Sequence, residues 1–254
     1  AEAIYRPFGF RFIYEKNKMT VTADVLRRAE TDEKWQIHSD QEVSGDIFCE
    51  EAKKEDLAEL ACFAEKQLSK LAEVYTVHDI AYFEQRMQEV GCEGGSLILI
   101  RKEKEICGYF LALKKDREAW EIVVEDAVQK KAFPAVLHWF GASEEKCTFT
   151  AFPQIWEQYA QSENVPAIMG RIVHLERFVC CLKIKKEQEW KIRLTDSLVP
   201  ENNGYFIIKT GIEGGSLIRV ENLSEKEKKM FCSMDIGQLT EELFRLPVFL
   251  NEVV

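Results

Sequence analysis

The stretch from Ser96 to Glu125, S-L-I-L-I-R-K-E-K-E-I-C-G-Y-F-L-A-L-K-K-D-R-E-A-W-E-I-V-V-E, decides the fold class of this chain. Its apolar runs are short and are separated by charged groups, a pattern typical of strands joined by tight turns. The spacing predicts strands over residues 96–101, 106–114 and 119–125, with a charged turn at 102–105. We therefore expect three successive antiparallel strands that form a meander.

Helical patterns flank this meander. Residues 55–75 place apolar side chains at helical spacing, and 79–90 form a second, shorter pattern of the same kind. After the meander, residues 128–140 are expected to be helical despite Pro134, and 147–152 to form another strand. Two helices, three strands, a helix and a strand predict an α+β domain with a mixed sheet.

The regions on either side of this domain contain further elements. Residues 8–26 are expected to form a hairpin that turns at Glu15–Lys18, and the charged segment 27–34 to be a linker. A third region begins at Pro166. Its expected elements are a strand at 167–173, a short helix at 175–181, strands at 190–195, 204–210 and 215–220, and a last helix at 236–244. This order predicts a second α+β domain with helices on one face of a mixed sheet.

Composition limits the classes of function. The chain has 254 residues, 46% of them apolar, which is enough for more than one core. Asp and Glu number 44 against 34 Lys and Arg, giving a net charge of −10. An acidic body argues against nucleic acid and against anionic membrane surfaces as partners. It is compatible with cationic amines as substrates, which long-range electrostatic attraction would favour.

The cysteines and histidines show no metal-ligand spacing. None of the eight cysteines forms a C-x-x-C pair, and the four histidines lie far apart in the sequence, so no zinc site is expected. No apolar stretch approaches the roughly 20 residues of a membrane span. Because no signal peptide is recognisable, we expect reduced thiols and a cytoplasmic location.

The first ten residues, A-E-A-I-Y-R-P-F-G-F, predict a corner between a helix and a strand. A helix that ends near Tyr5 would be stopped by Pro7, and Gly9 would reverse the chain. Two interpretations stay open at this point. Either the Tyr5 hydroxyl faces a cleft, or the ring of Tyr5 serves only to pack the corner.

Three segments carry a resemblance to a known family when they are taken in order. They are Ile4-Tyr-Arg-Pro-Phe-Gly-Phe10, then Tyr75-Thr-Val-His-Asp-Ile-Ala-Tyr-Phe83 with the meander that follows it, and finally Ala167–Val173 with Asp235–Phe244. Together they resemble the enhanced intracellular survival (Eis) family of the GNAT superfamily of N-acetyltransferases. The resemblance implies three regions. Residues 1–34 are the end of a first, catalytic GNAT domain plus a linker, 35–165 a central degenerate GNAT-like domain, and 166–254 a sterol-carrier-protein-like domain.

The resemblance also implies a mechanism that uses acetyl-CoA to acetylate primary amines. In this family, a Tyr just before a Phe-Gly turn is the general acid that protonates the departing CoA thiolate, and here that position is Tyr5. A phenol, with a pKa of about 10, is a suitable donor to a basic thiolate. The family's general base is its own C-terminal carboxylate, which is here that of Val254. The apolar residues near it favour a docked tail, and their burial would raise the pKa of the carboxylate.

The cofactor loop of such enzymes has no counterpart in the chain. A glycine-rich loop at a helix N-terminus would bind the pyrophosphate of CoA, whereas Asp126–Lys131 contains no glycine. The chain also has no initiator Met and starts beyond the place of the first domain's loop. We therefore expect the C-terminal part of a longer enzyme, inactive alone, with acetyl-CoA as the co-substrate of the full-length protein only. No cofactor-binding or metal-binding residue is expected in the chain itself.

Two other functions remain open from the sequence. The sterol-carrier-like domain could be a module that binds a lipid or another apolar ligand. Alternatively, the central and C-terminal domains could serve as an oligomerisation scaffold, since the resemblance implies a homo-oligomer, with a hexamer as the common assembly. The identity of the amine substrate does not follow from the sequence.

Overall fold

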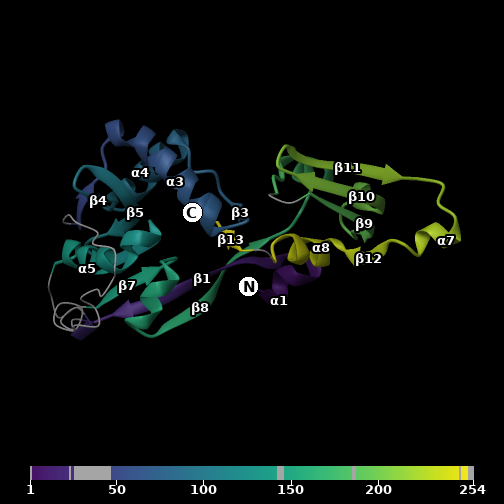
Figure 1. Ribbon diagram of the computed structural model, residues 1–254. Coiled ribbons are helices and arrows are strands. Elements are labelled where there is room, and N and C mark those ends of the chain that lie inside the picture. The colour runs from purple at the N-terminus through teal and green to yellow at the C-terminus, as the bar shows by residue number, and fades with distance from the viewer. Residues whose placement is uncertain are drawn as a thin grey trace. The chain divides into compact units, whose positions relative to one another are not determined.

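The computed structural model describes residues 2–22, 24–25, 47–141, 146–184, 187–245 and 247–250. These residues form two compact units (Figure 1). The first unit comprises 1–15, 72–75 and 166–254, and the second comprises 16–71 and 76–165. The second unit ends at Val165 and the first unit resumes at Pro166, and the division into three domains expected from the sequence stays a prediction. The expected linker at 27–34 lies outside the described residues, and the assignment of 1–34 to a separate catalytic domain stays a prediction.

The second unit is built on most of a seven-stranded sheet with the order β2-β4-β5-β6-β7-β1-β8, whose strands β1 and β8 continue into residues of the first unit. Its strands are β1 (Arg11–Val21), β2 (Ile47–Glu51), β4 (Ser96–Lys102), β5 (Glu105–Leu113), β6 (Glu118–Val124), β7 (Cys147–Thr150) and β8 (Ser162–Gly170). Strands β4, β5 and β6 pair antiparallel, which confirms the predicted meander. Strands β6 and β7 run parallel, so the sheet is mixed, as expected.

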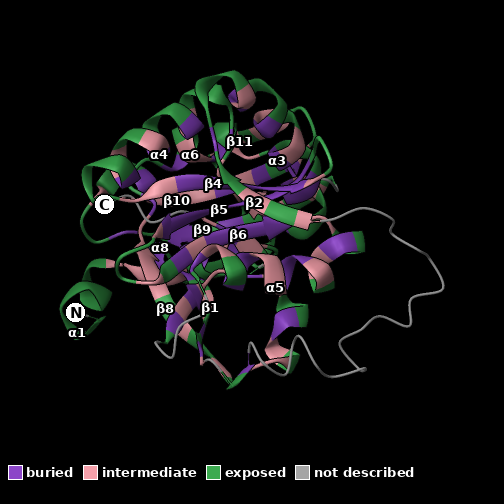
Figure 2. Cartoon of the chain, turned by 90° about the vertical axis from the view of Figure 1, so that its left-hand side faces the viewer, coloured by how far each residue is buried: buried purple, intermediate pink, exposed green. Residues whose placement is uncertain are grey.

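Helices cover both faces of this sheet. They are η2 (Lys54–Asp56), α3 (Leu57–Leu71), α4 (Ile80–Cys92), η3 (Asp126–Val128), α5 (Gln129–Trp139) and η4 (Gln154–Gln158). Phe110 belongs to the core that α5 completes. On the opposite face, the ring of Tyr109 contacts Phe63 of α3 and Phe83 of α4. Because both faces are covered, β4 and β5 are buried almost throughout, which Figure 2 shows in purple.

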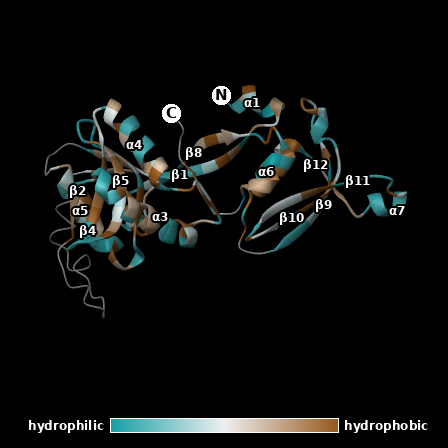
Figure 3. Ribbon diagram, turned by 90° about the horizontal axis from the view of Figure 1, so that it is seen from above, coloured by the Kyte–Doolittle hydropathy of each residue, from teal (hydrophilic) through white to brown (hydrophobic). Residues whose placement is uncertain are grey.

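The first unit holds a four-stranded sheet with the order β11-β10-β9-β12. Its elements are α1 (Glu2–Tyr5), η1 (Arg6–Phe8), β3 (Val74–Tyr75), α6 (Leu175–Cys181), β9 (Gln188–Thr195), η5 (Pro200–Asn202), β10 (Gly204–Gly211), β11 (Gly214–Val220), α7 (Glu225–Lys228), β12 (Cys232–Asp235), α8 (Ile236–Leu243) and β13 (Val248–Phe249). In the four-stranded sheet, β12 runs parallel to β9, and the two other pairs are antiparallel. Apolar residues of α6 and α8 share one core with β9 and β10, and the all-charged α7 is teal in Figure 3.

The structure corrects one predicted element. Residues 8–26 were expected to turn at Glu15–Lys18, but β1 runs through that segment as a single strand. The side chain of Asn17 donates to the carbonyl of Phe152 (3.1 Å) and accepts from its amide (3.0 Å), and Lys18–Val21 pair with β7. A partner 135 residues away thus keeps the charged segment extended. Smaller shifts occur at 72–75, where β3 replaces the end of the expected helix, and at β8, which begins at Ser162.

Candidate functional site

The corner that carries Tyr5 has the expected geometry. Helix α1 ends at Tyr5 and continues as η1, and Gly9 then adopts a left-handed backbone with φ of 83°. The Gly9 amide donates to the carbonyl of Arg6 (3.1 Å), which closes the turn before β1 begins. The Tyr5 side chain is 47% exposed, and its ring centroid lies 5.6 Å from that of Phe10. Tyr5 is therefore accessible, and one side of its ring is supported by Phe10.

A cavity of about 390 Å³ lies beside this corner, within the first unit. The turn segment from Arg6 to Gly9 forms one wall, the residues that follow β9 form another, and Asp235 and Ile236 at the start of α8 complete it. Arg6 and Arg11 bring cations to the lining, whereas Asp196 and Asp235 bring carboxylates. The cavity is therefore polar and carries both signs of charge.

Asp196 is the buried anchor of that second wall. Its carboxylate accepts hydrogen bonds from Arg171 (2.6 Å), from Asn202 (2.9 Å) and from the amides of Leu198 and Val199 (2.9 and 3.1 Å). Burial alone would raise the pKa of Asp196, but these donors outweigh it and lower the pKa. Asp196 is thus ionised near neutral pH and holds the wall in a fixed shape.

The chain's tail is docked as far as the structure describes it. Strand β13 pairs in parallel with β3, and the Pro247 carbonyl accepts from the amides of Glu73 and Val74 (2.8 and 3.2 Å). Phe249 is 7% exposed, and its ring lies 6.4 Å from that of Tyr14. This agrees with the expected docking of the apolar tail. Val254, the predicted source of the general base, lies outside the described residues.

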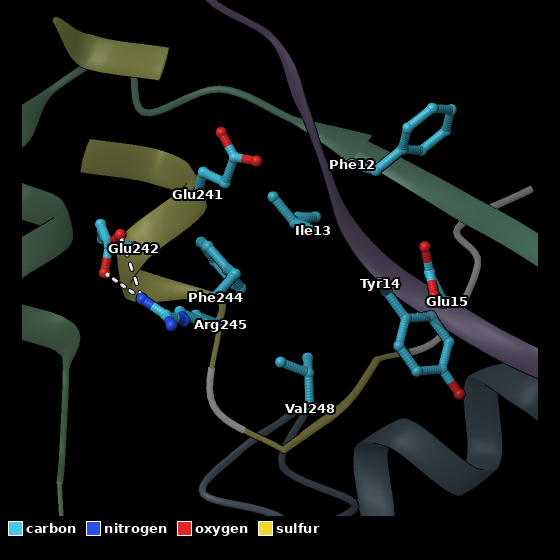
Figure 4. A pocket seen from close by; sticks show the side chains of 9 residues that line it. All are labelled: Phe12, Ile13, Tyr14, Glu15, Glu241, Glu242, Phe244, Arg245 and Val248. Carbon is cyan, nitrogen blue, oxygen red and sulfur yellow. Dashed lines mark hydrogen bonds and ion pairs between the residues drawn. The ribbon is translucent and has the colours of Figure 1, made fainter. Parts of the chain in front are cut away.

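A second cavity, of about 520 Å³, lies between the tail, β1 and α8 (Figure 4). Its lining combines apolar side chains with three carboxylates and one cation. Arg245, which follows the end of α8, lies 3.4 Å from Glu242 of that helix. The residues of this lining are Phe12, Ile13, Tyr14, Glu15, Glu241, Glu242, Phe244, Arg245 and Val248. Carboxylates beside aromatic rings make a hollow of this kind attractive to cations.

The second unit contains a buried polar cluster that the sequence analysis did not single out. Glu121, 4% exposed, accepts hydrogen bonds from the Tyr82 hydroxyl at both carboxylate oxygens (2.8 and 2.9 Å). His78 Nδ1 lies 3.5 Å from Glu121 and 2.7 Å from the hydroxyl of Tyr109, and Arg86 lies 3.9 Å from Glu121. The imidazole of His78 also stacks on the ring of Tyr82 at 4.1 Å. Glu121, Tyr82, His78 and Tyr109 therefore form one chain of close polar contacts.

Glu121 has an unusual ionisation and an unusual backbone. Burial raises the pKa of Glu121 to about 7, although the Tyr82 hydrogen bond and the charge of Arg86 oppose this rise. Burial and the nearby carboxylate also raise the pKa of Tyr82 and of Tyr109. The φ of Glu121 is +56°, at the place where β5 and β6 lose their regular register. A sequence signal did exist, since Glu121 interrupts an otherwise apolar strand.

The segment where a cofactor loop was sought forms a tight helical entry instead. Residues 126–128 make a 3-10 turn that leads into α5. The indole of buried Trp156 donates to the carbonyl of Gln129 (2.7 Å), and the Gln129 amide donates to the carbonyl of Val124 (3.2 Å). Protein groups therefore occupy the start of this helix.

Within the described part of the chain, no group of three or more His, Cys, Asp or Glu side chains is arranged to hold a metal ion. None of the helices described there is long and apolar enough to cross a membrane.

Comparison with known proteins places the fold. No protein-family model matches the chain, and no curated protein matches its sequence. Solved structures do match. A conserved protein of unknown function from Enterococcus faecalis V583, named as a candidate N-acyltransferase, superposes with a TM-score of 0.62 at 14% identity, over 95% of this chain and 59% of its own. GCN5-related N-acetyltransferases from Kribbella flavida and Anabaena variabilis ATCC 29413 give TM-scores of 0.60 and 0.59 at 14% and 13% identity.

The match to the Kribbella flavida protein covers 88% of this chain and 55% of the matched chain. The match to the Anabaena variabilis protein covers 96% of this chain and 61% of the matched chain. The chain thus has an α+β, mixed-sheet fold of the GCN5-related N-acetyltransferase (GNAT) type. It spans a little over half the length of the structures that it matches.

Proposed function

We propose that this chain is the C-terminal part of a longer N-acetyltransferase of the Eis type, which transfers the acetyl group of acetyl-CoA to primary amines. The observation that carries the proposal is the fold, which three N-acyltransferase-type structures share over 88–96% of this chain. Because the chain spans only 55–61% of them, the acetyl-CoA site is assigned to a preceding segment. Alone, the chain is inactive in this proposal.

Tyr5 is the proposed general acid. It is accessible at a turn whose backbone is fixed by Gly9, so its hydroxyl can meet a substrate supplied by the preceding segment. Proton donation from a positioned side chain accelerates such reactions by about 10²–10⁴-fold. The carboxylate of Val254 is the proposed general base, and the docking of residues 247–250 supports a held tail.

The acidic cavity next to this tail supports an amine as substrate. Glu15, Glu241 and Glu242 line the cavity together with aromatic side chains, an environment that favours a cation over an anion. The net charge of −10 acts in the same direction at long range. In this proposal the protein is a homo-oligomer, and both units contribute to its scaffold.

The gene provides the first test. A reading frame that extends upstream of Ala1 by roughly one domain of about 100–150 residues, with a glycine-rich loop before a helix, is expected. The encoded protein should acetylate a primary amine such as spermidine. A carboxy-terminal tag should abolish that activity, because it converts the terminal carboxylate into an amide. An active tagged protein would remove Val254 from the mechanism.

A second function is favoured by a separate cavity in the first unit. The lining of this cavity of about 530 Å³ includes the apolar side chains of Leu175, Phe206 and Leu217 and the polar side chains of His174 and Arg219. An apolar ligand with a polar head would fit such a lining. The probe is a fluorescent fatty acid titrated into the chain. Leu217→Trp, which fills the cavity, should abolish binding, whereas Ile218→Trp, at the exposed neighbouring position, should not.

A further inference from the structure

The Tyr5 corner and the first turn of α8 approach each other through two glycines of the first unit. A Cβ atom at Gly9 would lie 2.9 Å from Cγ2 of Ile236, and a Cβ atom at Gly237 would lie 2.5 Å from Cζ of Arg11. Both distances are shorter than a Cβ atom tolerates. The Gly9 turn therefore packs against the side chain of Ile236 in the first turn of α8, and the Arg11 guanidinium lies against the backbone of Gly237.

Arg11 closes this contact with hydrogen bonds to the corner. Its Nη1 donates to the carbonyl of Arg6 (3.1 Å) and to that of Phe10 (2.8 Å), the residues on either side of the Gly9 turn. The Arg6 carbonyl is also the acceptor for the Gly9 amide. Since the ring of Phe10 supports that of Tyr5, Arg11 restrains the residues that orient Tyr5.

The same guanidinium is held from the side of the helix. Its Nη2 lies 3.8 Å from Asp235, the N-cap residue of α8, and its Nε lies 3.8 Å from Glu241 in the second half of that helix. The Arg11 side chain is 15% exposed and the two carboxylates are 50% and 60% exposed, so solvent screens these ion pairs in part and they add to the hydrogen bonds at the corner. Arg11 is thus fixed between the corner and α8.

We propose that Arg11 is a positioning residue that clamps the Tyr5 corner against the first turn of α8. The inference rests on the proposed function, because it gives α8 the task of orienting the general acid. Helix α8 also leads into the docked residues 247–250, so one helix supports both the corner and the tail. A corner without the clamp would keep its fold but lose the fixed direction of the Tyr5 hydroxyl.

The first experiment measures hydrogen exchange of the Gly9 amide in the chain itself, without any assay of activity. Arg11→Met removes the clamp, and Gly237→Ala displaces the guanidinium while making α8 intrinsically more stable. Both variants should speed exchange at Gly9 about tenfold, with unchanged exchange in the β9–β10 core. The control, Arg245→Met, removes an exposed arginine just beyond the C-terminal end of α8 and should leave exchange at Gly9 unaffected. Unchanged exchange at Gly9 in both clamp variants would overturn the proposal.

The second experiment measures kcat and KM in the complete protein. Arg11→Met and Gly237→Ala should lower kcat by about tenfold to a hundredfold with KM nearly unchanged, since misplacement of a reacting group has this effect. Arg11→Lys should restore part of kcat. Suppose that Tyr5→Phe is inactive. If Arg11→Met and Gly237→Ala then speed exchange at Gly9 but leave kcat unchanged, the positioning role of Arg11 is excluded. If Tyr5→Phe is itself fully active, the clamp stands as shown by exchange, and the proposed role of Tyr5 fails.

Discussion

Glu121 combines a carboxylate, burial and a left-handed backbone at one position. Its pKa is raised to about 7 in the folded chain, above the ordinary value of 4.5, because burial disfavours the charged form. The folded state therefore binds this proton more tightly than the unfolded state. The resulting stability is present below the unfolded pKa and is lost as the pH rises through about 7.

Glu121→Gln should remove this pH dependence. We expect the unfolding free energy of the wild-type chain to fall by about 3 kcal/mol relative to the variant as the pH rises from about 4.5 to about 8, because the folded pKa of about 7 lies above the ordinary value of 4.5. Urea unfolding at a series of pH values measures the difference. Glu118→Gln, at the exposed start of the same strand, is the control and should follow the wild type. Equal pH slopes for wild type and Glu121→Gln would show that Glu121 does not titrate in this way.

Arg101 is a further residue whose charge is largely buried. It is 9% exposed and binds three carboxylates, those of Glu50, Asp56 (2.7 Å) and Glu59 (3.9 Å). Arg101→Met keeps the apolar stem but leaves Asp56, itself 16% exposed, without its cation. We expect a loss of roughly 2–3 kcal/mol in urea unfolding, because Glu50 and Glu59 are accessible and can be solvated.

Lys102→Met, at the next position of the same strand, serves as the control for Arg101→Met. It should change the stability by no more than about 0.5 kcal/mol. A loss of the same size in both variants would mean that the stem of Arg101, and not its three ion pairs, stabilises the sheet.

At the scale of elements, the docked tail makes a separate prediction. Phe249 is buried against Tyr14, and the Pro247 carbonyl covers the amides of Glu73 and Val74. Phe249→Ala should undock the tail and speed hydrogen exchange at these two amides by about tenfold or more, while β9 and β10 keep their protection. Ile212→Ala, 70% exposed in the same unit, should have no such effect. Slow exchange in Phe249→Ala would show that the two-residue pairing alone holds the tail.

Periodic elements were predictable from the sequence, and elements set by distant partners were not. Helix α3 and the meander follow their apolar spacing, so their predicted bounds agree with the structure within a few residues. In β1, the charged segment at Glu15–Lys18 looked like a turn because its partner, Phe152, is far away in the sequence. The Glu121 cluster could not be predicted, because it depends on which residues of β5 and α4 lie next to β6 in the folded chain. The Tyr5 corner was predictable because Pro7 and Gly9 act locally.

At the scale of the whole molecule, the account assigns cofactor binding to a segment outside this chain. Titration calorimetry with acetyl-CoA should therefore give no binding heat with residues 1–254, and a dissociation constant on the order of micromolar with the longer protein. The start of α5, occupied by Gln129 and Trp156, gives the physical reason within the second unit. Micromolar binding by residues 1–254 alone would place a cofactor site in this chain.

The most direct test of the account is the effect of Tyr5→Phe on the steady-state kinetics of the complete protein. The change removes one hydroxyl at an accessible position and leaves the ring contact with Phe10 intact. Tyr205→Phe, in the same unit, is the matched control. We predict that kcat falls by about a hundredfold or more, whereas KM for the amine stays nearly unchanged, because the hydroxyl acts only in the transition state. A Tyr5→Phe enzyme with wild-type kcat would contradict the account.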